Sequence, residues 1–397
     1  MPADGDELLD VRRLRRDTPA CEGILHFDSA GASLMPDPVY ERVVEHLELE
    51  RRVGGYEAAR LAAEDLEAFY DEVAALLGAD RDEIAFVENA TRAWDMAFYG
   101  LPLGAGDRVI THASEYASNY LALLQQAGRV GLEIDLAPSD DTGQIDVAAL
   151  ESLIRPTTRA IAITHVPSQG GLVNPARAVG GVARRHDLFY LLDACQSAGQ
   201  VELDVRRIGC HVLSGTGRKF LRGPRGTGFL YVARDCHERI QPPFVDLRAA
   251  TWSAPDRYEL APGARRYETF ESNVAGRLGL ARAVRYARER GIAAIEARVG
   301  RLAELLRSRL QEVPGVVVRD RGARRSGIVS FTRDGESAAE LKTRLREHGA
   351  YVSVSDASVA QLDLGARELP AVVRASVHYF NTEDEIDKLA RLIAAAE

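Results

Sequence analysis

The sequence is poor in lysine, in long apolar runs and in net positive charge. Its 397 residues include 50 Lys+Arg, yet the only lysines are Lys219, Lys342 and Lys388. No apolar run approaches the ~18 residues that a membrane-spanning helix needs, and the polar start MPADGDELLD is unlike a signal peptide. The net charge of -9 argues against a nucleic-acid partner, which usually needs a basic surface. We therefore expect a cytoplasmic protein that binds neither a membrane nor nucleic acid.

Cysteine is also scarce, with four residues at positions 21, 195, 210 and 236. No two of them form a C-x-x-C pair, and none has metal-binding spacing with the nine histidines, so we expect no metal site. Unpaired cysteines are typical of a reducing compartment, which agrees with the expected location.

What the sequence does contain, from about residue 86 to residue 232, is an alternation of short apolar strands with amphipathic helices. The segments RAIAITHV (159–166) and LFYLLDA (188–194) are apolar runs of strand length, as expected for strands buried on both faces. Helical patterns lie between the strands, for example at 92–101 and 175–186. This order predicts an α/β fold with a mostly parallel sheet wrapped by helices.

The pattern changes after residue 272. Two long amphipathic helices separated by Gly291 precede a strand, strand, helix, strand order, which predicts a small α+β domain with an antiparallel sheet. Thr382 and Glu385 have the spacing of a capping box at the last helix. We expect an N-terminal segment 1–25 that packs near the small domain, a large domain 26–285 and a small C-terminal domain 286–397.

Lys219 stands out in a chain that supplies positive charge with arginine. Lysine, unlike arginine, can lose its proton when its surroundings lower its pKa, so a retained lysine suggests a task for a neutral amine. One such task is a Schiff base with pyridoxal 5'-phosphate (PLP). The alternative is an ordinary surface lysine, and the neighbouring residues favour the cofactor.

Residues suited to PLP occur around this lysine in the strand-helix pattern. Asp193 ends an apolar strand, where ligands of open α/β sheets bind, and a PLP enzyme needs an acid near the pyridine nitrogen. Gln196 is placed to hydrogen-bond a cofactor oxygen. The segments NATRAWD and SGTGRK supply a helix start and polar side chains for the phosphate, with these candidates: Thr91, Ser214, Thr216 and Arg218.

The blocks DACQSAG (193–199) and TGRK (216–219) together resemble the class V aminotransferase-fold group of PLP enzymes, of fold type I. The group includes cysteine desulfurases, isopenicillin N epimerase-like proteins and C–S lyases. The similarity covers nearly the whole chain, from HFDSAGASLMP to VVRASVHYFNTEDEIDKL. It implies PLP as the cofactor, a large domain with a seven-stranded, mostly parallel sheet, and a homodimer with active sites near the interface.

The resemblance also implies roles for individual residues. Lys219 would form the Schiff base, Asp193 would pair with the pyridinium and Gln196 with the phenolic oxygen. Tyr116 would stack on the ring, with a core aromatic as the alternative, and Ser168 falls where the desulfurases have asparagine. The implied phosphate contacts are Ala90, Thr91, Thr216 and Arg218, and Arg92 and Ser214 are further candidates for binding the cofactor.

The implied substrate is a small amino acid. Arg374, in VRAS, would bind its carboxylate through a planar bidentate contact, with a structural ion pair as the alternative. Further substrate-site candidates are Ala30, Gly31 and Tyr56. Candidates for reaching the phosphate of a partner subunit are Glu271, Ser272 and Asn273.

The reaction is less sharply defined by the residues. Desulfurases of this group carry a thiol on a small-domain loop before the carboxylate-binding arginine, but the corresponding segment here, 351–374, contains no cysteine. We therefore expect a β-eliminating C–S lyase that converts an S-substituted cysteine or its sulfoxide to a thiol or sulfenate, pyruvate and ammonia, and not a cysteine desulfurase. The alternatives are an aminotransferase, an epimerase or a decarboxylation-coupled deaminase on a cysteine conjugate or related amino acid, and a PLP-fold protein without catalysis.

Overall fold

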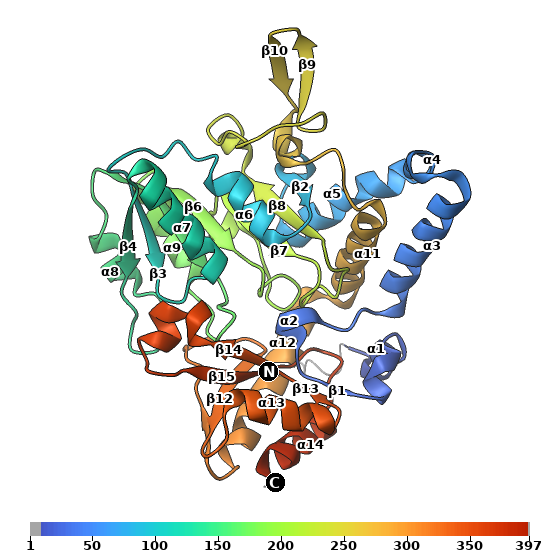
Figure 1. Cartoon of the computed structure of the whole chain (residues 1–397), viewed down its shortest axis with the longest axis vertical. Coiled ribbons are helices and arrows are strands. Elements are labelled where there is room, and N and C mark those ends of the chain that lie inside the picture. Colours follow the sequence, from blue (N-terminus) through green and yellow to red (C-terminus); the bar gives the residue numbers. More distant parts are fainter. Residues whose placement is uncertain (1–8, 396–397) are drawn as a thin grey trace.

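The computed structural model describes residues 9–395, and its centre is a seven-stranded sheet in the order β2-β8-β7-β6-β5-β3-β4 (Figure 1). The strands from β7 through β4 run parallel, whereas β8 is antiparallel to both β7 and β2. The mostly parallel sheet predicted from the sequence is therefore confirmed. The strands are β2 (Ile84–Val87), β3 (Arg108–His112), β4 (Glu133–Ala137), β5 (Thr158–Thr164), β6 (Phe189–Asp193), β7 (Val212–Thr216) and β8 (Gly228–Val232).

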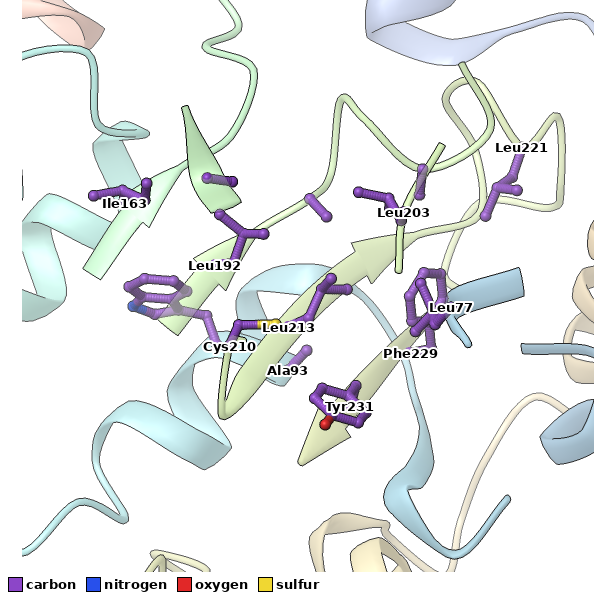
Figure 2. Close-up of a cluster of buried hydrophobic side chains, with 14 of the residues drawn as sticks. Leu77, Ala93, Ile163, Leu192, Leu203, Cys210, Leu213, Leu221, Phe229 and Tyr231 are labelled. Atoms are coloured by element: carbon purple, nitrogen blue, oxygen red, sulfur yellow. The ribbon is translucent and has the colours of Figure 1, made fainter. Parts of the chain in front are cut away.

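The central strands are buried on both faces. Every residue of β6 and of β7 is buried, which explains why their sequences lack the alternation of a half-exposed strand. Figure 2 shows the core beside them, where Leu192 and Leu213 from neighbouring strands lie with Cys210 and Phe229. Full burial of a large aliphatic side chain contributes about 1.5–3 kcal/mol to the free energy of folding, so this core stabilises the strands whose ends border the site.

Helices pack against the strands of this sheet, among them α5, α6 and α9. α6 begins after Asn89, whose side chain accepts a hydrogen bond of 2.8 Å from the Arg92 N–H. The helices of this part are α1 (Val11–Arg16), α2 (Ser29–Ala32), α3 (Asp37–Val53), α4 (Gly55–Leu61), α5 (Ala63–Leu77), α6 (Ala90–Phe98), α7 (Ala117–Val130), α8 (Val147–Ser152), α9 (Ala176–Arg185), α10 (Val205–Ile208) and α11 (Val274–Arg290).

The C-terminal part is a four-stranded antiparallel sheet in the order β11-β12-β15-β14 with three helices, the small α+β unit predicted from the sequence (Figure 1). Gly291, with φ of 82°, separates α11 from α12, and Thr382 and Glu385 form the expected capping box. The domain boundary at 285/286 stays a prediction, since α11 runs through it. The elements are α12 (Ile292–Gln311), β11 (Val316–Val318), β12 (Ile328–Arg333), α13 (Ala338–Glu347), β14 (Ser353–Asp356), β15 (Ala371–Ser376) and α14 (Glu383–Ala394).

The N-terminal segment joins the two parts. Its strand β1 (Leu25–His26) pairs in parallel with β13 (Ala350–Tyr351) of the C-terminal part. Buried Arg222, in the left-handed region with φ of 61°, donates to the Thr18 hydroxyl at 2.6 Å, the Leu34 carbonyl at 2.7 Å and the Tyr379 hydroxyl at 2.8 Å. This arginine therefore links the large sheet unit to both ends of the chain.

A hairpin of β9 (Ala250–Ala254) and β10 (Arg257–Leu260) projects from the top of the molecule in Figure 1. Its Trp252 is 73% exposed and its Tyr258 is 59% exposed. The strand patterns in the sequence did not predict this hairpin, whose residues are mostly polar and exposed. Among residues 9–395, no helix is long and apolar enough to cross a membrane.

Candidate active site

A cavity of about 410 Å³ lies where β5, β6 and β7 reach their carboxyl ends. All of the predicted cofactor residues except Arg92 and Ser214 line it, so the fold brings together segments that are far apart in the sequence. Arg92 instead places its guanidinium 4.5 Å from the centre of the Phe244 ring. Ser214 is buried directly beside the cavity, because it pairs in register with Asp193 across β6 and β7.

Lys219 follows β7 and points its amine toward the cavity. The residue is 7% exposed, and Nζ lies 5.9 Å from the centre of the Tyr116 ring. Burial lowers the pKa of Lys219, which favours the neutral amine that covalent chemistry requires. The loop that carries Lys219 packs closely against Gly199, the last glycine of DACQSAG. A Cβ at this position would lie 2.5 Å from the Phe220 carbonyl atoms, so only glycine fits there without a shift of the loop.

Asp193 ends β6 with its carboxylate held by two donors. Oδ1 accepts from the Cys195 backbone N–H at 2.8 Å, and Oδ2 accepts from the Asn119 side-chain amide at 3.0 Å. The carboxylate therefore has a fixed orientation at the strand end, as the predicted contact with a pyridine nitrogen requires.

Three buried polar atoms at the site have no hydrogen-bond partner among the described residues: Gln196 Oε1, Ser214 Oγ and Arg374 Nε. Leaving a buried polar group unpaired costs about 1–3 kcal/mol, so Gln196 Oε1, which belongs to a lining residue, is expected to bond a group that enters the cavity. The start of α6, the Thr216 hydroxyl and Arg218 could hold a phosphate, while Lys219 and Asp193 supply an amine and a carboxylate. This donor set fits PLP.

Arg374 reaches the site from β15 of the C-terminal sheet. Its Nη1 donates to the Ser168 carbonyl at 2.9 Å, and its Nη2 contacts Asp28 Oδ1 at 3.3 Å. The Asp28 contact is an ion pair, as the structural alternative for this arginine requires. The side chain is only 9% exposed and its Nε is unpaired, which leaves part of the guanidinium fork for a ligand carboxylate.

The remaining predicted substrate and partner residues lie in three different places. Gln196 Nε2 donates to the Ala30 carbonyl at 3.1 Å, and Arg218 donates to the Gly31 carbonyl, so this segment borders the site through its backbone. Tyr56 on α4 is 83% exposed and does not line the cavity of this chain. Also outside the cavity, in the turn that leads into α11, are Glu271, Ser272 and Asn273.

Sequence reasoning missed Glu115, Asn119 and Thr164, which lie beneath the cavity. Asn119 and Thr164 line it, and Glu115 is buried behind them with hydrogen bonds to both. The available signal was an acidic residue soon after a buried strand, followed four positions later by an amide at the start of a helix.

Within the segment 351–374, which contains no cysteine, the part between β14 and β15 folds into two short helical turns, Ala357–Val359 and Gln361–Gly365. Ala360, Leu364 and Val372 form a small apolar cluster of its own. Asp363 Oδ2 accepts from Gln169 Nε2 at 3.2 Å, so the segment is tied to the loop that follows β5.

Comparison with known protein families shows which family has this arrangement. The aminotransferase class-V family matches residues 25–389. The chain belongs to this family. A probable cysteine desulfurase of Methanothermobacter thermautotrophicus is 29% identical over 386 residues, which cover 96% of each chain.

Solved structures give the same assignment. The apo cysteine desulfurase of Thermococcus onnurineus NA1 superposes with a TM-score of 0.90 and 26% identity, over 96% of this chain and 97% of that one. The cystine C–S lyase C-DES, in complex with its product cysteine persulfide, has a TM-score of 0.86 and 26% identity, over 95% and 99% of the two chains. In another structure of C-DES, glycine is covalently linked to the PLP cofactor. The fold is therefore that of the fold type I PLP enzymes, and the chain is a PLP-dependent enzyme.

These findings correct the function predicted from the sequence. The expectation of a β-eliminating C–S lyase, with cysteine desulfurase set aside, is contradicted by full-length similarity to proteins named cysteine desulfurases. The reason for the error is physical. A missing loop cysteine removes one possible sulfur acceptor, but it changes none of the residues that line the cavity.

Proposed function

We propose that this enzyme is a PLP-dependent cysteine desulfurase that removes the sulfur of cysteine and leaves alanine. The observation that carries the proposal is the cavity lined by the buried Lys219 and Asp193, beside which Arg374 from the other sheet donates to the carbonyl of Ser168, itself a lining residue. The names of the relatives, whose sequences match almost the whole chain, support cysteine as the substrate.

The cofactor contacts follow from the donors around the cavity. The first N–H groups of α6, at Ala90 and Thr91, together with Thr216 and Arg218, would hold the phosphate. Asp193 would keep the pyridine nitrogen protonated, Gln196 would contact the phenolic oxygen and Tyr116 would cover one face of the ring. When bound, PLP supplies an electron sink that acidifies the Cα–H bond of the amino acid.

The substrate is oriented by Arg374, whose unpaired Nε and partly occupied fork are available to the α-carboxylate. Lys219 is placed to accept the Cα proton, because its pKa is lowered by burial and its amine faces the cavity. The two residues come from different sheets, so a shift of the C-terminal part against the large sheet would alter their distance and the reaction rate.

The sulfur acceptor is proposed to be a thiol from outside the chain. Cys195 lines the cavity, but its burial raises its pKa well above the usual range, which keeps it protonated. The other cysteines are buried away from the cavity at positions 21, 210 and 236. The balanced reaction is then cysteine plus RSH giving alanine plus RSSH, in which the sulfur moves from Cβ to the external thiol and Cβ gains a proton.

The test is to incubate the purified holoenzyme with cysteine, with and without dithiothreitol, and to quantify alanine, sulfide and pyruvate. With dithiothreitol we expect alanine and sulfide in equal amounts, because its second thiol displaces sulfide from the persulfide as the disulfide forms, and faster turnover than with cysteine as the only thiol. The Cys195→Ala variant should behave like the wild type. Formation of pyruvate and ammonia in place of alanine would overturn the proposal.

We also propose that the enzyme is a homodimer, with a cytoplasmic location expected from the sequence. Apolar side chains are exposed on and near the β9–β10 hairpin, among them Trp252, Leu247 and Phe244. A two-stranded hairpin is marginally stable alone, so a second subunit is a physical reason for its persistence. Light scattering of the purified protein would measure the mass, and a monomer at micromolar concentration would contradict the proposal.

A further inference from the structure

Glu115 is a buried carboxyl beneath the cavity, in the turn between β3 and α7, and is 5% exposed. Its Oε1 accepts from the Asn119 side-chain amide at 2.9 Å, from the Tyr116 backbone N–H at 2.9 Å and from the Thr164 hydroxyl. Its Oε2 accepts from the Thr111 hydroxyl at 3.2 Å. One oxygen atom thus gathers donors from α7, from the turn before it and from β5.

Two of those donors lead to residues expected at the cofactor. The Asn119 amide nitrogen also donates to Asp193 Oδ2 at 3.0 Å, so a single amide group bridges the two carboxyl groups. The Tyr116 N–H that bonds Glu115 also contacts the Thr164 hydroxyl at 3.0 Å, and Tyr116 carries the ring nearest Lys219. Asp193 would meet the edge of the cofactor ring and Tyr116 its face.

We propose that Glu115 is a positioning residue that holds Asp193, through Asn119, and Tyr116, through its backbone, in the arrangement that receives the cofactor. Glu115 does not line the cavity and is not itself a contact of the cofactor. The proposal rests on the cofactor contacts proposed above for Asp193 and Tyr116, and not on the identity of the sulfur acceptor or product.

The charge around Glu115 agrees with a role that depends on hydrogen bonding. The groups that face it are the hydroxyls of Thr111 and Thr164, the Asn119 amide and the Asp193 carboxylate, and no cation pairs with it among the described residues. Burial raises the pKa of Glu115 to about 7, with Asp193 adding to the shift. An uncharged acceptor of the same shape, such as glutamine, should therefore keep the arrangement.

The test compares Glu115→Ala with Glu115→Gln, using PLP binding to the protein after cofactor removal and the visible absorbance of the reconstituted enzyme across pH. We expect E115A to bind PLP about tenfold or more weakly and to shift the pH dependence of the visible band, because Asn119 and Tyr116 lose a shared acceptor. We expect E115Q to restore both towards the wild type. Asn119→Ala, which removes only the bridge to Asp193, should reproduce the shifted band if E115A does not fold.

The matched control is Glu83→Ala, which removes another buried carboxyl of the same sheet unit. Glu83 accepts from Arg206 at 2.9 Å and from the Arg234 N–H at 3.0 Å, outside the cavity. E83A should lower the melting temperature yet leave PLP affinity and the band unchanged. The proposal is overturned if E115A and N119A keep the wild-type affinity and band, if E115Q fails to restore them, or if E83A produces the same shift. Failure of the desulfurase proposal would instead appear as altered products with these binding results intact.

Discussion

The large sheet and the C-terminal sheet stand differently to the cavity, since the large-sheet part supplies its lining residues and the C-terminal sheet reaches it through the bond from Arg374 to Ser168. The large sheet places Lys219 and Asp193 at or just beyond the ends of strands that are buried on both faces, and surrounds them with a hydrogen-bond network. The C-terminal sheet contributes Arg374 from a strand and the segment 357–370, which has only a small apolar cluster and a few polar ties. The first side, the large sheet, carries the proposed cofactor contacts, and the second side, the C-terminal sheet, carries the proposed contact of the substrate carboxylate. Residues of the first side are therefore expected to control the cofactor, and residues of the second to control substrate binding.

The largest effect is expected on the large-sheet side, at Lys219. Lys219→Ala should lower turnover by more than about a thousandfold and abolish the visible band of the holoenzyme, because no other amine occupies the cavity. Lys219→Arg should fail equally, since arginine keeps its proton. Lys342→Ala, on the exposed face of α13, is the matched control and should change neither absorbance nor turnover. A K219R enzyme that kept the band would break the assignment of this side to the cofactor.

Next in size is the loss of Arg374. Arg374→Gln should raise the KM for cysteine by between about tenfold and a hundredfold, the range expected for a lost charge-assisted hydrogen bond, while the cofactor band stays in place. Steady-state kinetics and the absorbance spectrum measure the two effects. Arg367→Gln changes an arginine of the neighbouring segment that bonds Asp363 and the Arg319 carbonyl, and it should leave KM unchanged. A displaced cofactor band in R374Q would show that the C-terminal sheet also affects the cofactor, which would contradict the proposed separation of cofactor and substrate contacts.

A smaller effect concerns stability and pH on the large-sheet side. The pKa of Glu115 is raised from 4.5 to about 7 by burial, so the folded protein holds a proton that the unfolded chain releases between those values. Stability should fall as pH rises through this window, by up to about 3 kcal/mol, and the cost should persist above it. Glu115→Gln removes that cost, so the free energy of unfolding of the variant relative to the wild type should increase from about pH 5 to about pH 8. Denaturant unfolding at several pH values measures the trend, and a constant difference would contradict it.

The smallest effect is expected at the segment of the C-terminal part. Asp363→Asn removes the ion pair to Arg367 and weakens the bond from Gln169, each at a partly exposed site. We expect a stability loss of about 1 kcal/mol or less and a change in KM of a few fold, with the cofactor spectrum unaltered. If D363N instead changed PLP affinity, the segment 357–370 would affect cofactor binding as the residues of the large sheet are expected to do.

The same contrast explains what the sequence could predict. Lys219 and Asp193 were visible because a scarce lysine and a strand-terminal acid are local patterns, and the apolar runs of β5 and β6 fixed the class of the sheet. Glu115 was not visible, since its role depends on a turn, a helix and two strands meeting in space. The β9–β10 hairpin was missed because its strands are short and mostly exposed, and they lack the buried apolar run that marked β5 and β6.

The wrong prediction of the reaction has a related cause. It took the absence of a cysteine from 351–374 as a statement about chemistry at the amino acid, although no residue of that segment lines the cavity. Tyr56 lies 83% exposed on α4 and outside the cavity of this chain, so its contact with the substrate stays a prediction. Both cases concern parts of the chain whose surroundings are not determined by the buried strands.

The pairing of β1 with β13 has a consequence for the order in which the parts of the chain fold during synthesis. Leu25 is translated early, but its partner Ala350 leaves the ribosome only near the end of synthesis, as does Tyr379, which bonds Arg222. Closing a loop this long is costly in entropy and slow, so the N-terminal segment waits for the last part of the chain. A protein fused to the N-terminus could accordingly delay this final step of folding without touching the cavity.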